Sequence, residues 1–101
     1  MTGSSSQSII QDGYARCGAG TCLFQLSAGE GLFWVVPSCG RHKVPSYLDG
    51  KTTSAWNRTP TPVILYDGGS YTGRLGTMPG HFQGDLAAHH DNKVSSVDAA
   101  C

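Results

Sequence analysis

The chain carries little charge, and its charges cancel. Seven acidic and seven basic residues among 101 give a formal net charge of zero at pH 7. Proteins that bind nucleic acids or anionic membranes need a concentrated positive field, so this balance argues against both classes. No apolar run approaches the roughly 20 residues that a membrane-spanning helix needs.

The sequence also lacks the side-chain arrangements of common enzymes. No carboxylate pair, no cysteine with a partner base and no glycine-rich phosphate loop stands out. Helical periodicity is nearly absent as well, and the stretch "GDLAAHH" is the one candidate for a helical turn. We therefore expect an all-β protein that acts by binding and has no enzyme activity.

What the chain does have is glycine and short apolar runs. Its 14 glycines, together with Pro, Asn and Asp, separate runs such as "CLFQL", "GLFWVV" and "PVILYD". Runs of this length between turn residues are typical of strands. We expect most of residues 32–36 to lie in the core, with Trp34 forming an exposed rim beside the basic stretch "RHK".

Four cysteines supply the braces that a single small domain needs. An even set in a short, glycine-rich chain indicates disulfides and secretion, whereas zinc ligands would come in closely spaced pairs. Three pairings are open. The small residues in "CGAGTC" allow a tight loop, which favours Cys17 with Cys22 and leaves Cys39 for Cys101. In the chain-entropy model the longer loop stabilises more, by about 4 against about 2 kcal/mol.

The polar N-terminus predicts a flexible tail over residues 1–16, followed by a single domain over residues 17–101. Ile9 and Ile10 interrupt the Ser, Gly and Gln of this tail, so the pair could add as a strand to a partner's sheet. The first residues lack the charged start and apolar core of a signal peptide, as expected of a mature secreted form.

The sequence repeats itself with an offset of 42 positions, the distance from Asp49 to Asp91. Without a gap, "DGKTTS" then lies over "DNKVSS", and the two repeats span about 22–56 and 64–98. Further matched pairs are Leu23 with Leu65, Phe24 with Tyr66, Gly31 with Gly73 and Pro37 with Pro79. Four short strands cannot bury both faces of a repeat alone, so two copies are expected to share one core as a sandwich.

Asn57 begins a glycosylation sequon in "NRTP", which we interpret instead as a stiff connection between the copies.

The segment "YDGGSYTG" resembles the Greek-key signature of βγ-crystallins: an aromatic, four residues, a second aromatic, one residue and Gly. In that family the aromatics pack across a folded hairpin, and the Gly adopts a backbone conformation that a side chain would hinder. The first half keeps Phe24 and Gly31 but has Gly29 in place of the second aromatic, so its hairpin is expected to be less tightly pinned. The resemblance covers most of residues 17–101 and implies two Greek-key motifs in a disulfide-braced, βγ-crystallin-like β-sandwich.

The loop "DNKVSS" is similar to the calcium motif of microbial βγ-crystallins, in which a Ser or Thr hydroxyl from one loop completes the site of its neighbour. The resemblance implies calcium ligands at Asp91, Asn92, Ser95, Asp49 and Thr53. Because most of these oxygens are neutral, weak binding is expected, with a Kd of about 10⁻⁵ to 10⁻³ M. Gly50 in "DGKTTS" offers no side-chain oxygen, so the site around Asn92 is expected to be the better one. The same loop is also typical of an Asx-turn that needs no metal.

Two functions are open at this point. Secreted actinobacterial proteins with this fold inhibit metalloproteinases, and "CGAGTC" is similar to the start of those inhibitors. This resemblance implies a secreted, non-enzymatic peptidase inhibitor with a protease as its partner. The alternative is an adaptor or interaction module of a larger secreted toxin or cell-surface assembly, docking through Ile9 and Ile10. A lens-type structural protein fits the fold but not the disulfide framework.

Overall fold

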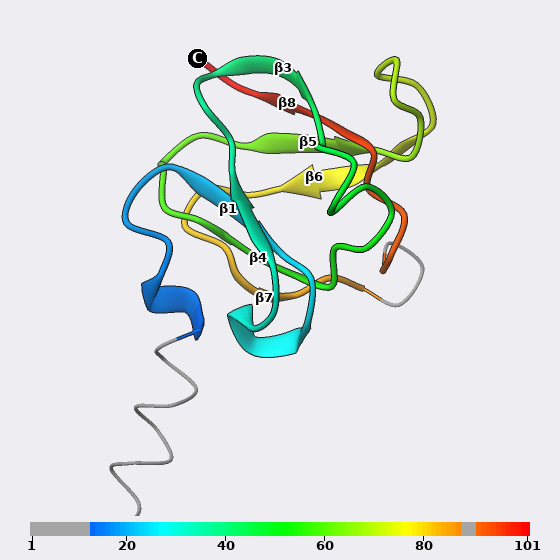
Figure 1. Ribbon diagram of the computed structural model, residues 1–101. Helices are drawn as coiled ribbons and strands as arrows, with labels where there is room; N and C mark the ends of the chain where they lie inside the picture. The colour runs from blue at the N-terminus through cyan, green and yellow to red at the C-terminus, as the bar shows by residue number, and fades with distance from the viewer. Residues whose placement is uncertain (1–12, 88–90) are drawn as a thin grey trace, which may run out of the picture.

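The computed structural model describes residues 13–87 and 91–101 and shows two antiparallel sheets packed on each other (Figure 1). In chain order the elements are β1 (Thr21–Phe24), the 3-10 helix η1 (Ser27–Gly29), β2 (Phe33–Val35), β3 (Gly40–Lys43), β4 (Ser54–Asn57), β5 (Val63–Tyr66), β6 (Arg74–Met78), β7 (Gln83–Asp85) and β8 (Ser96–Ala99). The first sheet has the order β2-β1-β4-β7, and the second has the order β3-β8-β5-β6. The predicted all-β, disulfide-braced Greek-key sandwich is confirmed.

No helix within the described ranges is long and apolar enough to cross a membrane. The stretch "GDLAAHH" begins with the end of β7, and its last three residues lie outside the described ranges, so the helical turn there stays a prediction.

The repeat offset of 42 positions carries β1 onto β5, β2 onto β6, β3 onto β7 and β4 onto β8. Each sheet combines three strands of one repeat with the third strand of the other, β7 in the first sheet and β3 in the second. Both exchanged strands pair with the fourth strand of the other repeat. The two repeats therefore share their sheets as well as their core.

The main core lies between the sheets and comes from alternate strand positions. Leu23 and Ala55 of the first sheet pack with Val63, Leu65 and Val97 of the second, and all five are almost fully buried. Because strand side chains alternate, Cys22 and Phe24 point to the outer face of the first sheet. A second, smaller core forms there from Tyr14, Cys17, Cys22 and Phe24.

The apolar run 32–36 is only partly core. Val36 is buried and Trp34 packs against the main core, but Leu32 is 50% exposed and Val35 is 40% exposed. The expectation is wrong for Leu32 and Val35 because β2 lies at the edge of its sheet. Apolarity alone does not tell an edge strand from a central one.

Both predicted disulfides are present. Cys17 bonds to Cys22 across 5 positions, and Cys39 bonds to Cys101 across 62 positions. The long bridge joins the start of β3 to the C-terminal residue, where β3 and β8 pair (Figure 1). It therefore closes most of the domain into a single covalent loop.

Asn57 ends β4 and closes the connection between the repeats. Its Oδ1 accepts hydrogen bonds from the hydroxyls of Thr21 at 3.0 Å and Thr59 at 2.7 Å. Its Nδ2 donates to the carbonyls of Thr61 at 2.8 Å and Pro79 at 3.2 Å. The side chain is fully buried and its polar groups are used, which agrees with a structural connection and leaves no room for a glycan.

Candidate functional site

The loops "DGKTTS" and "DNKVSS" lie side by side and exchange backbone hydrogen bonds. The N–H of Asn92 donates to the carbonyl of Thr52 at 2.9 Å, and the N–H of Gly50 donates to the carbonyl of Val94 at 3.1 Å. Gly50 and Thr52 match Asn92 and Val94 under the repeat offset, so the two bonds are symmetry equivalents. The exchange fixes each loop against the other.

The structure brings two of the predicted calcium ligands together across the loops. The hydroxyl of Thr53 donates to Asn92 Oδ1 at 3.4 Å. Among the described residues, the buried Oδ1 atom of Asp91, the residue before Asn92, has no hydrogen-bond partner. Asp49 is exposed and Ser95 is half-buried. Under the repeat offset, the equivalent pair is Ser95 and Gly50. This pair cannot form the same side-chain hydrogen bond, because Gly50 has no side-chain oxygen.

Gly50 and Asn92 hold the same backbone conformation. Their φ angles are 69° and 58°, in the left-handed region that Gly adopts freely and that Asn tolerates better than most residues. The sequence shows Gly50 only as a missing oxygen, whereas the structure shows a backbone position that admits few residue types. A Cβ added at Gly50 would lie 3.7 Å from the Asn92 carbonyl, an ordinary contact, so the loop has room for a side chain.

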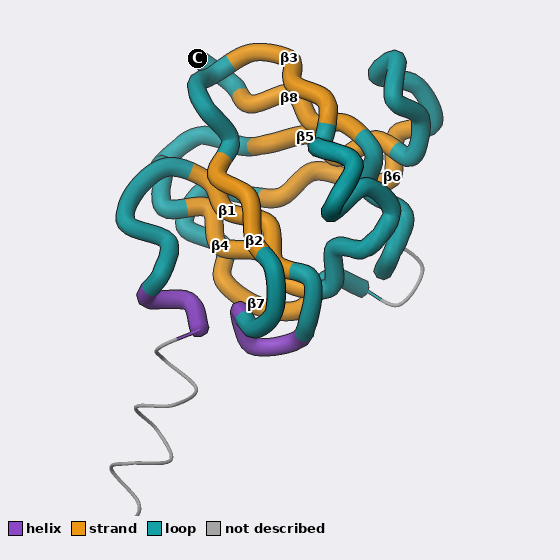
Figure 2. The backbone as a smooth tube through the Cα atoms, in the orientation of Figure 1, coloured by secondary structure: helices purple, strands orange, loops and turns teal. Residues whose placement is uncertain are grey.

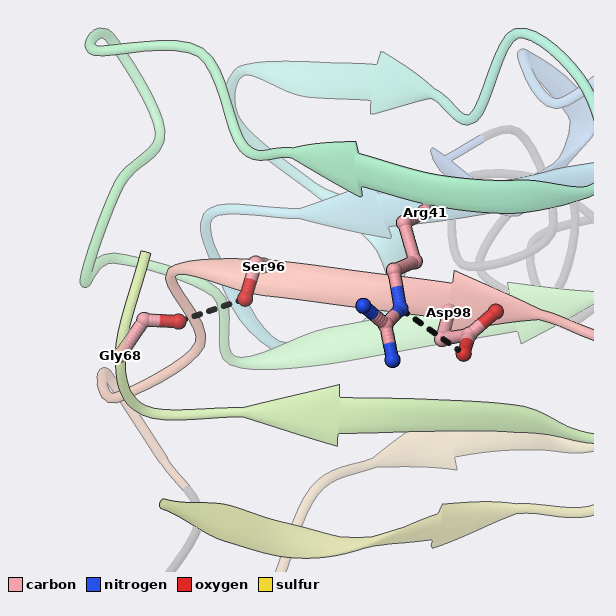
Figure 3. Close-up of polar contacts among 4 residues, drawn as sticks. All are labelled: Arg41, Gly68, Ser96 and Asp98. Carbon is pink, nitrogen blue, oxygen red and sulfur yellow. Dashed lines mark hydrogen bonds and ion pairs between the residues drawn. The ribbon is translucent and has the colours of Figure 1, made fainter. Parts of the chain in front are cut away.

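The last Ser of each loop holds the folded hairpin of its own repeat. The hydroxyl of Ser54 donates to the carbonyl of Leu26 at 2.6 Å, and the hydroxyl of Ser96 donates to the carbonyl of Gly68 at 2.5 Å. Figure 3 shows the second of these bonds, with the ion pair of Arg41 and Asp98 on the neighbouring strands β3 and β8. Both serines are fully buried. This position of the motif is therefore structural.

The oxygens around Asn92 fit a hard cation that is held weakly. Calcium prefers carboxylate, amide, hydroxyl and carbonyl oxygens. Among residues 13–87 and 91–101, no three His, Cys, Asp or Glu side chains come together, so an ion here would depend on neutral oxygens. A buried carboxylate oxygen without a partner is costly, and a bound cation would satisfy the free Oδ1 of Asp91.

Residues upstream of the predicted domain boundary complete the first hairpin. Tyr14 is 9% exposed and packs edge-on against Phe24, with 5.5 Å between the ring centroids. It lies directly over Gly29, where an added Cβ would come within 2.6 Å of the Tyr14 backbone nitrogen. Figure 2 shows the short helical turn at residues 13–15 beside η1. Tyr14 thus supplies the aromatic contact that the first repeat itself lacks, which removes the reason to expect that this hairpin is less tightly pinned.

Arg16 fastens the same segment. Its Nη2 donates to the carbonyl of Gly29 at 2.7 Å, and its guanidinium lies 4.7 Å from the ring centroid of Phe33. Residues 13–16 therefore belong to the domain, and the predicted boundary at Cys17 is too late. The sequence does carry a weak signal for this contact, since one repeat lacks an aromatic and Tyr14 lies shortly before it.

The loop "CGAGTC" is held by Arg58 as well as by its disulfide. Arg58 Nη1 donates to the carbonyls of Cys17 and Gly18, each at 2.6 Å, and the Arg58 N–H donates to the carbonyl of Gly20 at 2.9 Å. The guanidinium also lies over the ring of Trp56, 4.6 Å from a ring centroid. The exposed part of this loop is thus presented on a fixed backbone.

Ile9 and Ile10, the predicted docking residues of the alternative function, lie outside the described residues. Their role as a partner-binding strand stays a prediction.

A family model for peptidase inhibitor family I36 matches residues 11–78. The match includes the upstream segment with Tyr14 and Arg16, and it ends at the last residue of β6. No match was found among curated proteins.

Several βγ-crystallin domains are among the solved structures with the same fold. One from Flavobacterium johnsoniae superposes with a TM-score of 0.68 at 15% identity, covering 80% of this chain and 93% of that one. A second, from Clostridium beijerinckii, gives 0.67 at 16% identity, covering 79% and 95%. A βγ-crystallin from an archaeon gives 0.68 at 18% identity, covering 81% and 98%. At these identities the likeness concerns the fold.

Proposed function

This chain belongs to peptidase inhibitor family I36, and from that membership we propose that it is a secreted, non-enzymatic protein that binds and inhibits an endopeptidase. The family match over residues 11–78 is the observation that carries the proposal. The resemblance of "CGAGTC" to metalloproteinase inhibitors favours a metalloendopeptidase as the target. Two disulfides agree with secretion, because such bonds persist in oxidising compartments.

The rigidity of the sandwich supports this role. A tight inhibitor loses less conformational entropy on binding when its surface is already held in the bound conformation. Here the first hairpin is fixed by Tyr14 on Phe24, and the neighbouring loop is fixed by the Cys17–Cys22 bridge and Arg58. These contacts gather on one side of the first sheet, within the part of the chain that the family model matches.

An inhibition assay tests the proposal directly. The full chain with both disulfides intact is titrated at up to micromolar concentration against a panel of secreted bacterial metalloendopeptidases, with serine endopeptidases as the comparison set. We expect stoichiometric loss of activity for at least one metalloendopeptidase, with the inhibitor chain still intact in the complex. Simple degradation of the chain as a substrate, or full activity across the panel, would contradict the proposal.

Weak calcium binding is a second candidate, favoured by the unpartnered Asp91 Oδ1 and by the contact of Thr53 with Asn92. We propose that Asp91, Asn92 and Thr53 hold one ion, and that Asp49 and Ser95 belong to a weaker equivalent. A bound ion would add a cross-link between two loops that already exchange backbone bonds. With few carboxylates the affinity should be low, with a Kd of about 10⁻⁵ to 10⁻³ M.

A further inference from the structure

The edge strands of the two sheets differ in how they are protected. Of the four, β3 carries Arg41 and Lys43, β6 carries Arg74 and β7 carries Asp85. Charges on an edge discourage pairing with a strand of another protein. The remaining edge strand, β2, has the sequence "FWV" and carries no charge. Within the described ranges β2 is the edge that is open to strand addition.

The backbone of β2 presents free hydrogen-bonding groups on its outer side. Leu32 accepts a hydrogen bond from Gln25 at 2.8 Å, and Val36 donates to Thr21 at 2.8 Å, so these residues face β1. Peptide groups alternate along an antiparallel strand, and those of Phe33 and Val35 therefore face away from β1.

Tyr47 covers part of this outer side. Its hydroxyl donates to the outward carbonyl of Phe33 at 3.2 Å. The N–H and the carbonyl of Val35 have no hydrogen-bond partner within residues 13–87 and 91–101, so they form a complete pair for a strand that approaches from outside.

The large exposed hydrophobic side chains of the described residues gather around β2. They are Leu26 at 51% exposure, Leu32 at 50%, Tyr47 at 45% and Val35 at 40%. Leu26 lies in the hairpin between β1 and β2, Leu32 directly precedes β2, and the hydroxyl of Tyr47 is hydrogen-bonded to β2. A cluster of this kind next to free backbone groups is typical of an interaction surface.

We propose that the outer edge of β2 is the surface with which this protein binds its peptidase, by pairing with the main chain that lines the enzyme's active-site cleft. The inference rests on the proposed function. In strand addition, main-chain hydrogen bonds provide affinity and alternate side chains provide specificity. Val35 would supply the bonds, and Leu26 and Leu32 would supply apolar contacts. All of these residues lie within the matched range 11–78, whereas β7 and β8 lie beyond it.

The position of β2 also suits a competitive inhibitor. Phe33 stacks on Phe24 with 5.7 Å between centroids, and Arg16 covers its ring. The strand therefore meets the cleft on a fixed backbone. An uncharged strand also avoids the cost of burying an unpaired charge when the cleft closes over it.

A matched pair of lysine variants tests the edge. Val35→Lys places a charge on β2, and Gln83→Lys places the same charge on β7, the opposite edge of the same sheet. Val35 and Gln83 are both exposed, so both variants should fold, which circular dichroism and thermal melting would check. With a sensitive metalloendopeptidase from the panel, Val35→Lys should raise the inhibition constant by about tenfold or more, and Gln83→Lys should leave it within about twofold.

Hydrogen exchange on the wild-type complex gives a readout that needs no variant. The Val35 amide, which is free of β1, should exchange more slowly once the peptidase is bound. If the wild type inhibits but the two variants are equally potent and the Val35 amide stays unprotected, the edge is not the binding surface and the proposed function stands.

Two other outcomes also decide against the inference. If the wild type inhibits no peptidase, both the proposed function and the role of β2 fall. If sedimentation shows a wild-type dimer that Val35→Lys converts into a monomer with undiminished inhibition, a second copy of this chain is the occupant of β2.

Discussion

Tyr14 packs against Phe24 in the way that Tyr71 packs against Tyr66 in the second repeat. Both pairs are edge-on with an interplanar angle of 86°, at 5.5 and 6.2 Å between ring centroids. Phe24 and Tyr66 are equivalent under the repeat offset, but Tyr14 comes from upstream of the repeat. The aromatic contact of the first hairpin is thus kept while its source in the chain has changed.

Because Tyr14 packs over Gly29, we expect that Gly29 cannot be replaced by a residue with a side chain. Its φ is 72°, and an added Cβ would lie 2.6 Å from the nitrogen and 2.8 Å from Cδ1 of Tyr14. Gly29→Ala should therefore lower the free energy of unfolding by about 2 kcal/mol or more, from backbone strain and overpacking together.

The matched control is Gly18→Ala, since a Cβ at Gly18 would meet nothing within 4 Å. It should change the free energy of unfolding by no more than about 0.5 kcal/mol. Urea denaturation at pH 7 measures both. Equal stability of the two variants would show that a Cβ added at Gly29 does not disturb the packing of Tyr14.

Tyr14 also predicts a loss of stability in alkali. Burial raises the pKa of the Tyr14 phenol above its usual value of about 10; a hydrogen bond with Ser54 partly offsets this rise, and the negative charge of Asp85 adds to it. Below pH 10 the phenol is neutral in both states and the stabilisation is fully present. As the pH rises above 10 towards the folded-state pKa, the unfolded chain ionises first, and the free energy of unfolding falls.

Short denaturant titrations between pH 8 and pH 12, on wild type and Tyr14→Phe, measure this effect. Phe keeps the ring and removes the ionisable hydroxyl, so the variant should lose less stability over the same interval. Parallel curves for the two proteins would mean that other groups cause the alkaline loss.

The parts of the fold that the sequence predicted depend on patterns that recur along the chain. Strand runs between glycines, the 42-position repeat and the cysteine spacing each constrain the backbone locally or by symmetry. The hydroxyls of Ser54 and Ser96 repeat in the same way, and both hold a hairpin. Features that obey the repeat could therefore be predicted.

The features that were missed break the repeat. Tyr14 packs over Gly29, and because glycine has no side chain, the sequence marks this contact only weakly, by the missing aromatic of the first repeat. Val35 lies in a fully apolar run, yet it is exposed because β2 happens to be an edge strand. Strand order is a property of the assembled sheets, and no residue within β2 encodes it.

The two disulfides should contribute unequally to stability. In the chain-entropy model, closing 62 positions stabilises by about 4 kcal/mol and closing 5 positions by about 2 kcal/mol. Replacing Cys39 and Cys101 by Ser should therefore cost more than replacing Cys17 and Cys22 by Ser. Guanidinium denaturation of the two double variants measures the difference, and a larger cost for the short bridge would show that packing around buried Cys17 outweighs chain entropy.

The proposed calcium sites are unequal, and this inequality predicts opposite effects for two reciprocal substitutions. Asn92→Gly removes the amide oxygen while keeping a residue that accepts a φ near 58°, and Gly50→Asn adds an amide at the equivalent backbone, where a side chain has room. Asn92→Gly should weaken calcium binding about tenfold or more, whereas Gly50→Asn should strengthen binding at the second loop.

Calorimetric titration of chelator-treated protein measures both affinities, and melting at millimolar calcium reports the linked stabilisation. Melting without calcium is the control, because Asn92→Gly should change the calcium-free stability by less than about 1 kcal/mol. Should the wild type show neither heat nor thermal stabilisation at millimolar calcium, the loops are turns only. Their exchanged backbone bonds would then account for them without an ion, and the free oxygen of Asp91 would need water as its partner.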